Sequence, residues 1–200
     1  MTLLQSRERT RLQVETMPPA ERPAEFAILG LLATEESGSH GYDLARAFTA
    51  GEPLGAILRL EAGMLYHHLK RLERAGSVTQ SIAKAGSRPP RQIYRLTEAG
   101  RERLFTWLQS PVEHTREIRL DFLVKLYFAG RLEPELATRL IDTQLRTLIE
   151  LRESLAREDA TDAFLRSVTE LRTAQTEAAI RWLESLNRAG KPAQTRRTGV

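Results

Sequence analysis

One stretch, EAGMLYHHLKRLERAG at residues 61–76, constrains the fold of this chain more than any other. Its leucines recur at intervals of four and three residues, at Leu65, Leu69 and Leu72, so they form one apolar stripe along a helix. Gly76 is suited to end that helix, because glycine readily adopts the left-handed conformation of a C-terminal cap. The pattern predicts a helix that buries one face and presents the opposite face to solvent.

The sequence before this stretch predicts two further helices. Residues 24–34 are apolar nearly all round, which is typical of a buried core helix. Residues 41–50 predict a shorter helix, and we expect Tyr42, Leu44 and Phe48 to form its inward face.

After the stretch, residues 77–82 and 92–96 have the composition of short β-strands, joined by a tip that contains glycine and two prolines. Thr97 is a predicted N-cap for a helix that runs to about residue 110. Three helices, a hairpin and a linking helix occur in this order in a winged helix-turn-helix, with the hairpin as the wing.

The second half of the chain predicts helices only. They are expected at residues 116–129, at residues 134–157, and in a last segment that ends at Asn187. The first of these is too apolar to lie on a surface, and together the three offer more apolar edge than one chain covers. We therefore expect a homodimer whose interface is formed by the helices centred on Phe122, Leu148 and Leu171.

These patterns divide the chain into four parts. We expect a flexible arm at 1–23, a winged helix-turn-helix DNA-binding domain at 24–110, a helical dimerisation domain at 111–187 and a basic flexible tail at 188–200. Met17 is an alternative starting residue. The predicted fold is thus mainly α.

Charge and composition narrow the function. Ten basic residues but only four acidic ones lie between Arg59 and Arg103, which fits a DNA-reading module. The chain has no cysteine, which excludes disulfides and thiolate metal sites. No window is apolar for the length of a membrane span and the N-terminus lacks the apolar core of a signal peptide, so we expect a cytoplasmic protein without membrane partners.

The polar face of the 61–76 helix and the hairpin tip are the candidate DNA contacts. Cationic side chains on such a helix meet phosphates, and its first residues reach base edges in the major groove. A charged helix face alone is also typical of any solvated helix, but three cations at a hairpin tip repel one another and contribute nothing to folding. The predicted DNA-contacting residues are Gly63, Met64, Tyr66, His67, Lys70, Arg71, Arg74, Lys84, Arg88 and Arg91.

Several segments together resemble the PadR family of transcriptional regulators. They are HGY at residues 40–42, GMLYHHLKRLERAGSV at 63–78, YRLTEAGRERL at 94–104 and DFLVKLYFAG at 121–130. Within the second, Met64 and His67 stand where the family usually has threonine and proline, so the family's DNA sequence preference is not carried over.

The resemblance implies a homodimeric repressor that binds a palindromic operator in double-stranded DNA and is released by a small, often aromatic, effector. Five aromatic residues could line an apolar effector pocket or could belong to the core, namely Phe105, Trp107, Phe122, Tyr127 and Trp182.

Enzymatic readings find no support. The four histidines have no metal-ligand spacing, and the sequence contains neither a glycine-rich phosphate loop nor a nucleophile elbow. We therefore expect neither catalysis nor a cofactor or metal. The alternative function is a winged-helix protein–protein interaction module without operator binding.

Overall fold

The computed structural model describes residues 22–35, 37–83, 91–159 and 161–190. Most of the predicted arm, the wing tip and most of the predicted tail therefore lie outside the described residues. The first half contains α2 (Arg22–Thr34), β1 (Ser39–His40), α3 (Gly41–Arg46), α4 (Pro53–Ile57), α5 (Ala62–Arg74), β2 (Val78–Ala83), β3 (Arg91–Leu96) and α6 (Glu98–Gln109). The second half contains α7 (Thr115–Glu117), the π-helical turn η1 (Ile118–Phe122), α8 (Leu123–Leu132), α9 (Pro134–Ala156) and α10 (Ala163–Gly190).

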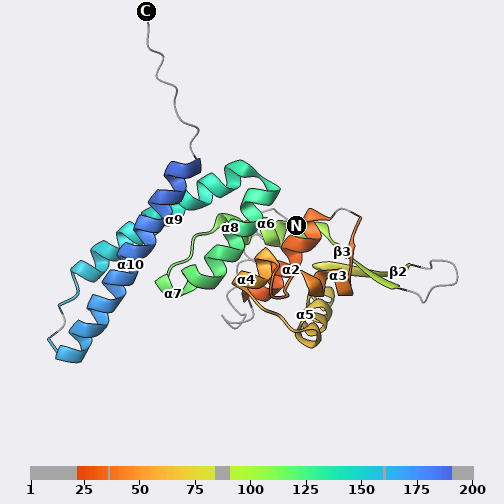
Figure 1. Ribbon diagram of the computed structural model, residues 1–200, viewed down its shortest axis with the longest axis horizontal. Coiled ribbons are helices and arrows are strands. Elements are labelled where there is room, and N and C mark those ends of the chain that lie inside the picture. Colours follow the sequence, from red (N-terminus) through yellow and green to blue (C-terminus); the bar gives the residue numbers. More distant parts are fainter. Residues whose placement is uncertain (1–21, 36, 84–90, 160, 191–200) are drawn as a thin grey trace, which may run out of the picture.

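The first half is a winged helix-turn-helix, as predicted. Its sheet is antiparallel with the order β1–β3–β2, and β2 and β3 form the wing, which projects from the helices in Figure 1. Strand β1 was not predicted, because two residues are too short to show an alternating pattern. Its pairing of Ser39 with Tyr94 and His40 with Ile93 ties the start of α3 to the root of the wing.

The predicted caps of this half are confirmed. Helix α5 ends at Gly76, which has a φ of 69°. The Gly76 amide donates to the Glu73 carbonyl and the Ser77 amide to the Leu72 carbonyl, the pairing of a Schellman motif. At the start of α6, the Thr97 hydroxyl accepts from the Gly100 amide at 3.0 Å.

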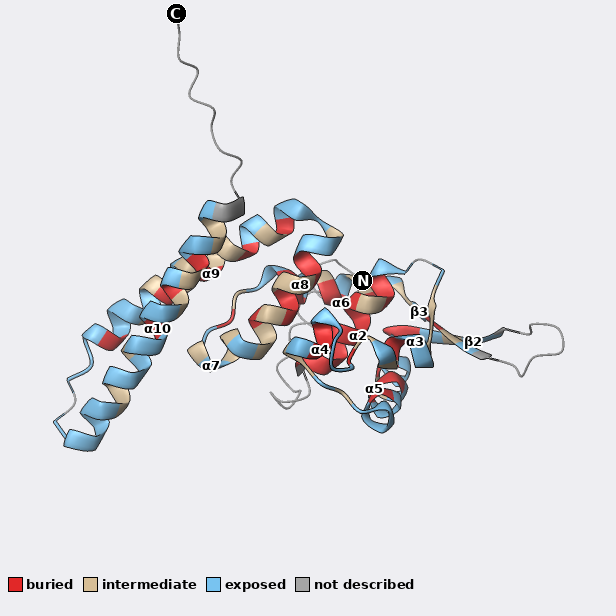
Figure 2. Cartoon of the chain, viewed as in Figure 1, coloured by how far each residue is buried: buried red, intermediate tan, exposed pale blue. Residues whose placement is uncertain are grey.

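The helical half packs on the winged helix through α8, which contacts α2, α4 and α6 (Figure 1). Helices α9 and α10 then form an antiparallel hairpin. The Asn187 side chain donates a hydrogen bond to Asp142 toward one end of it, and Arg172 forms an ion pair with Glu158 toward the other. The burial colours in Figure 2 show that α2 is largely enclosed and that the far end of this hairpin is exposed. No helix in the described ranges combines the length and apolarity needed to cross a membrane.

Two buried polar side chains from the helical half hold the segment that joins the halves. Lys125 of α8 donates to the carbonyls of Trp107 and Ser110 at 2.6 and 2.7 Å. Gln144 of α9 accepts from the Val112 amide and donates to the Val112 carbonyl, both at 2.8 Å. The end of α6 and the segment after it are therefore fixed by hydrogen bonds to their backbone.

Several sequence expectations were wrong in detail. Tyr42 does not face inward: it is 75% exposed, whereas Leu44 and Phe48 are buried as expected. Phe122 and Leu148 are fully buried within one chain, so they are not available as a surplus edge for a dimer. Packing against elements distant in the sequence decides whether each of these side chains is buried. The helical period of a single segment, such as 41–50, does not contain that information.

Smaller differences concern element ends. The helix α4 lies between the predicted helices at 41–50 and 61–76, and α8 continues through Gly130, beyond the predicted end at residue 129. Glycine lowers helix propensity by about 1 kcal/mol, which enclosure by neighbouring helices can outweigh.

Candidate nucleic-acid interface

Helix α5 has the two faces that its sequence predicted. Leu65, Leu69 and Leu72 are buried in the core. The opposite face is exposed and carries Gly63, Met64, Tyr66, His67, Lys70 and Arg74. Six of the seven predicted contacts on this helix thus share one solvent-facing surface, which we call the α5 face.

Arg71 is the seventh, and it lies differently. Its side chain is 31% exposed, and its Nε lies 3.2 Å from Oε1 of Glu25 in α2. Glu25 is itself buried and also pairs with Arg103 of α6, at 3.1 Å between Nη2 and Oε2. His68 is buried beside them, with Nδ1 3.7 Å from Glu25 Oε1. This Glu25 cluster joins α2, α5 and α6, so Arg71 is placed to hold the α5 helix within the domain.

The wing is described up to its tip. Ala83 pairs with Arg91 at the outermost described rung of the hairpin. Lys84 and Arg88 lie outside the described residues, and of Arg91 only the backbone is described. Arg95, which the sequence did not single out, adds an exposed cation to β3, where its Nη1 donates to the Ser81 hydroxyl at 2.7 Å.

Between strand β3 of the wing and α5 lies a groove of about 610 Å³. Its lining residues come from β1, α3, α5 and β3, and are His40, Gly41, Tyr42, Asp43, Tyr66, Gln92 and Tyr94. We call it the tyrosine groove. The sequence did not predict this groove, because α3, α5 and β3 come together only in the folded chain.

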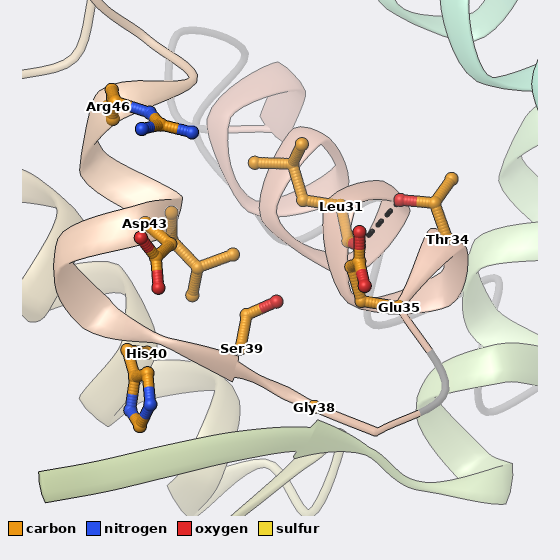
Figure 3. Close-up of a pocket in the computed structure, with 9 residues that line it drawn as sticks. Leu31, Thr34, Glu35, Gly38, Ser39, His40, Asp43 and Arg46 are labelled. Atoms are coloured by element: carbon orange, nitrogen blue, oxygen red, sulfur yellow. Dashed lines mark hydrogen bonds between the residues drawn. The ribbon is translucent and has the colours of Figure 1, made fainter.

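A smaller cavity of about 350 Å³ lies on the other side of β1 and α3. Figure 3 shows Asp43 and Arg46 of α3 on one side of it and Thr34 and Glu35 at the end of α2 on the other. The Thr34 hydroxyl is bonded to the Leu31 carbonyl at 2.8 Å. The lining carries both signs of charge, and no cluster of three metal-ligating side chains occurs in the described part of the chain.

The five aromatic pocket candidates do not line either cavity. Trp107 is buried and stacks on Phe26, with ring centroids 4.3 Å apart, and Lys125 Nζ lies 4.5 Å from the Trp107 ring. Phe122 meets Trp182 edge to face at 6.0 Å. Phe105 and Tyr127 are partly buried against the core. These contacts place Trp107 between the two halves, whereas Phe122 and Trp182 meet within the helical half.

Comparison with known proteins shows which family the winged-helix half of the chain resembles. Residues 28–105, which include α3, α5 and the wing, match the sequence model of the transcriptional regulator PadR-like family. Over these residues the chain is similar to the PadR-like family. It is similar to the negative transcriptional regulator PadR of Bacillus subtilis (strain 168), with 32% identity over 127 residues that cover 62% of this chain and 66% of the relative. The chain thus matches just under two thirds of that relative's length.

Two solved structures of the Bacillus subtilis regulator are also similar. The crystal structure of PadR in complex with operator DNA is 25% identical and covers 85% of this chain and 98% of its own, with a TM-score of 0.43. The structure of PadR in complex with p-coumaric acid is 24% identical and covers 84% and 99% of the two chains, with a TM-score of 0.39.

Proposed function

We propose that this chain is a sequence-specific DNA-binding regulator of transcription, a ligand-responsive repressor that works as a homodimer in the cytoplasm without catalytic activity. The observation that supports this most is the α5 face. It presents Lys70, Arg74 and His67 to solvent, within the residues that match the PadR-like family. A helix with cations along an exposed face and base-reading side chains near its start is suited to the major groove.

In this proposal residues 24–110 read DNA and residues 111–187 hold two copies together. Support for a second copy comes from one side of α10, where Phe164 is 74% and Leu171 58% exposed. With the half-buried Val168 they fall at i, i+4 and i+7, so they form one apolar stripe. Two-fold pairing would place two α5 helices on one palindromic operator.

The test of DNA binding is a gel shift with the duplex upstream of the protein's own gene, beside a scrambled duplex of equal length. If six to ten phosphates are neutralised per dimer, affinity should fall roughly 10³- to 10⁵-fold between about 50 and 200 mM salt. Affinity for both duplexes that barely changes with salt would contradict the proposal and favour a protein partner.

Substitutions on the α5 face and the wing separate base reading from backbone binding. His67→Ala should lower the preference for the upstream duplex by roughly 1–3 kcal/mol, the value of a lost base contact. Arg88→Ala and Arg91→Ala should weaken binding to both duplexes equally and reduce the slope of affinity against salt concentration. An unchanged affinity ratio for His67→Ala would remove His67 from the reading residues.

We extend the proposal to a small aromatic effector, in line with the p-coumaric acid complex of the Bacillus subtilis regulator. The only two tryptophans of the chain, Trp107 and Trp182, are both among the five candidate residues. Their fluorescence should therefore change on titration with p-coumaric acid, and the same ligand should release the upstream duplex. Unchanged fluorescence together with undisturbed DNA binding would exclude this phenolic acid as effector.

A further inference from the structure

Three of the four tyrosines of this chain gather in the tyrosine groove. Tyr42 comes from the start of α3, Tyr66 from α5 and Tyr94 from β3. The fourth, Tyr127, lies on α8 beneath the Arg131 guanidinium, 3.5 Å from its ring centroid. Among the described residues, the groove lining contains no lysine or arginine, and its hydrogen-bonding groups are hydroxyls, an amide, an imidazole and one carboxylate.

The groove is built by close packing around one of these rings. A Cβ added at Gly41 would lie only 2.7 Å from the Cε1 and Oη atoms of Tyr66, so glycine is needed for the ring to rest against α3. Tyr94 is buried and donates its hydroxyl to Gln92 Oε1 at 3.0 Å, and burial raises the pKa of Tyr94. Tyr94 thus supports the groove as a neutral donor, whereas Tyr42 and Tyr66 are 75% and 41% exposed.

The position of the groove matters if the proposed function holds, and the inference rests on it. When α5 enters the major groove and the wing reaches the neighbouring minor groove, the sugar–phosphate strand that separates the two grooves must pass between α5 and the wing. The tyrosine groove lies there, between Tyr66 of α5 and Gln92 of β3, one rung from the outermost described pair of the wing.

We propose that the tyrosine groove binds a sugar–phosphate strand of duplex DNA, with the Tyr42 and Tyr66 hydroxyls donating to phosphate oxygens. Tyrosine hydroxyls are among the side-chain groups that contact DNA phosphates. Being neutral, they displace no counterion, so their contribution to affinity is independent of salt. This distinguishes them from Lys70 and Arg74, the cations of the α5 face.

Asp43 is the one group in the groove that opposes a phosphate. Its side chain is exposed and also borders the smaller cavity, where Figure 3 shows it near the start of α3. The proposal therefore predicts that Asp43→Asn tightens binding to any duplex, because it removes a repulsion without adding a cation.

The test compares Tyr42→Phe, Tyr66→Phe and Asp43→Asn with wild type, using the upstream and scrambled duplexes at several salt concentrations between about 50 and 200 mM. Phenylalanine keeps the ring and removes only the hydroxyl. Each tyrosine variant should bind both duplexes roughly 3- to 10-fold more weakly, the value of one hydrogen bond, with an unchanged salt slope. Thr138→Val, which removes an exposed hydroxyl from α9 outside the groove, is the control and should bind as wild type. Arg74→Ala should lower the salt slope by about one.

Three results would overturn the inference. Unchanged affinity in both tyrosine variants would show that the groove does not hold the backbone. A loss confined to the upstream duplex would make the tyrosines base readers, and weaker binding by Asp43→Asn would exclude a phosphate beside it. These outcomes presuppose wild-type binding, and a wild type that binds neither duplex would refute the proposed function as well.

Discussion

The winged-helix half and the α9–α10 hairpin bury their apolar residues differently. In the winged helix, the large apolar or aromatic side chains that stay exposed are Tyr42, Met64, Tyr66 and Ile82, all on the proposed DNA side. In the hairpin they are Phe164, Leu165 and Leu171, within two turns of one helix. The exposed residues of the winged helix carry a hydroxyl or stand singly beside polar neighbours. Those of the hairpin include an apolar stripe that a partner helix could cover. The winged helix therefore closes its core within one chain, and the hairpin leaves part of its apolar surface uncovered.

The buried polar groups of the two regions differ as well. Around Glu25, charges from three helices meet one another, whereas Gln144 of the helical half hydrogen-bonds the backbone of Val112. Breaking a buried charge pair leaves an uncompensated ion, while losing a side-chain bond to the backbone leaves one or two neutral groups unsatisfied. We therefore expect the loss of a buried polar side chain to lower the free energy of unfolding more in the winged helix than in the helical half.

The largest effect is expected where the hairpin depends on a partner. The double variant Phe164→Asp, Leu171→Asp removes four large apolar side chains from a two-fold interface, worth roughly 6–12 kcal/mol if all are buried there. The molecular mass measured by light scattering should then fall from twice 22.6 kDa to 22.6 kDa. The control is Ser185→Asp on the same helix, an exposed position about four turns beyond Leu171.

Two outcomes would contradict this prediction. A wild-type monomer at micromolar concentration would remove the dimer from the proposal. A double variant that remains dimeric would place the interface elsewhere on the chain.

The next effect concerns the Glu25 cluster. Glu25→Gln should lower the free energy of unfolding by roughly 3–5 kcal/mol, because Arg103 loses its buried counter-charge. Glu177→Gln breaks an exposed pair with Arg181 and should change it by at most about 1 kcal/mol. Urea unfolding of both variants measures the difference. Equal destabilisation would mean that the cluster is no more sensitive than the surface.

A smaller effect is expected at the joint between the halves. Gln144→Leu replaces the amide with an apolar side chain of similar size and leaves the Val112 amide and carbonyl unsatisfied. This should lower the unfolding free energy by about 1–3 kcal/mol. Gln109→Leu, at an exposed position on α6, is the matched control. If Gln144→Leu lowered the unfolding free energy as much as Glu25→Gln, buried charged and neutral groups would not differ in the way predicted.

Much of this protein is determined by residues close together in the sequence. The buried stripe Leu65–Leu69–Leu72, the cap at Gly76 and the N-cap at Thr97 all depend on contacts within about four residues, which the helical period makes visible. The same period separates the exposed side of α5 from its core side. Helix order, the wing and the α5 face were therefore predictable.

Only the tertiary structure decided which polar and aromatic residues face which partner. Arg71 has the spacing of a DNA contact, but Glu25, which lies in another helix, draws it inward. Tyr42 has the spacing of a core residue, yet the packing of α3 leaves it exposed beside Tyr66. The pattern of one helix defines its two faces, whereas the partner of each face comes from elements distant in the sequence, and no local periodicity encodes that choice.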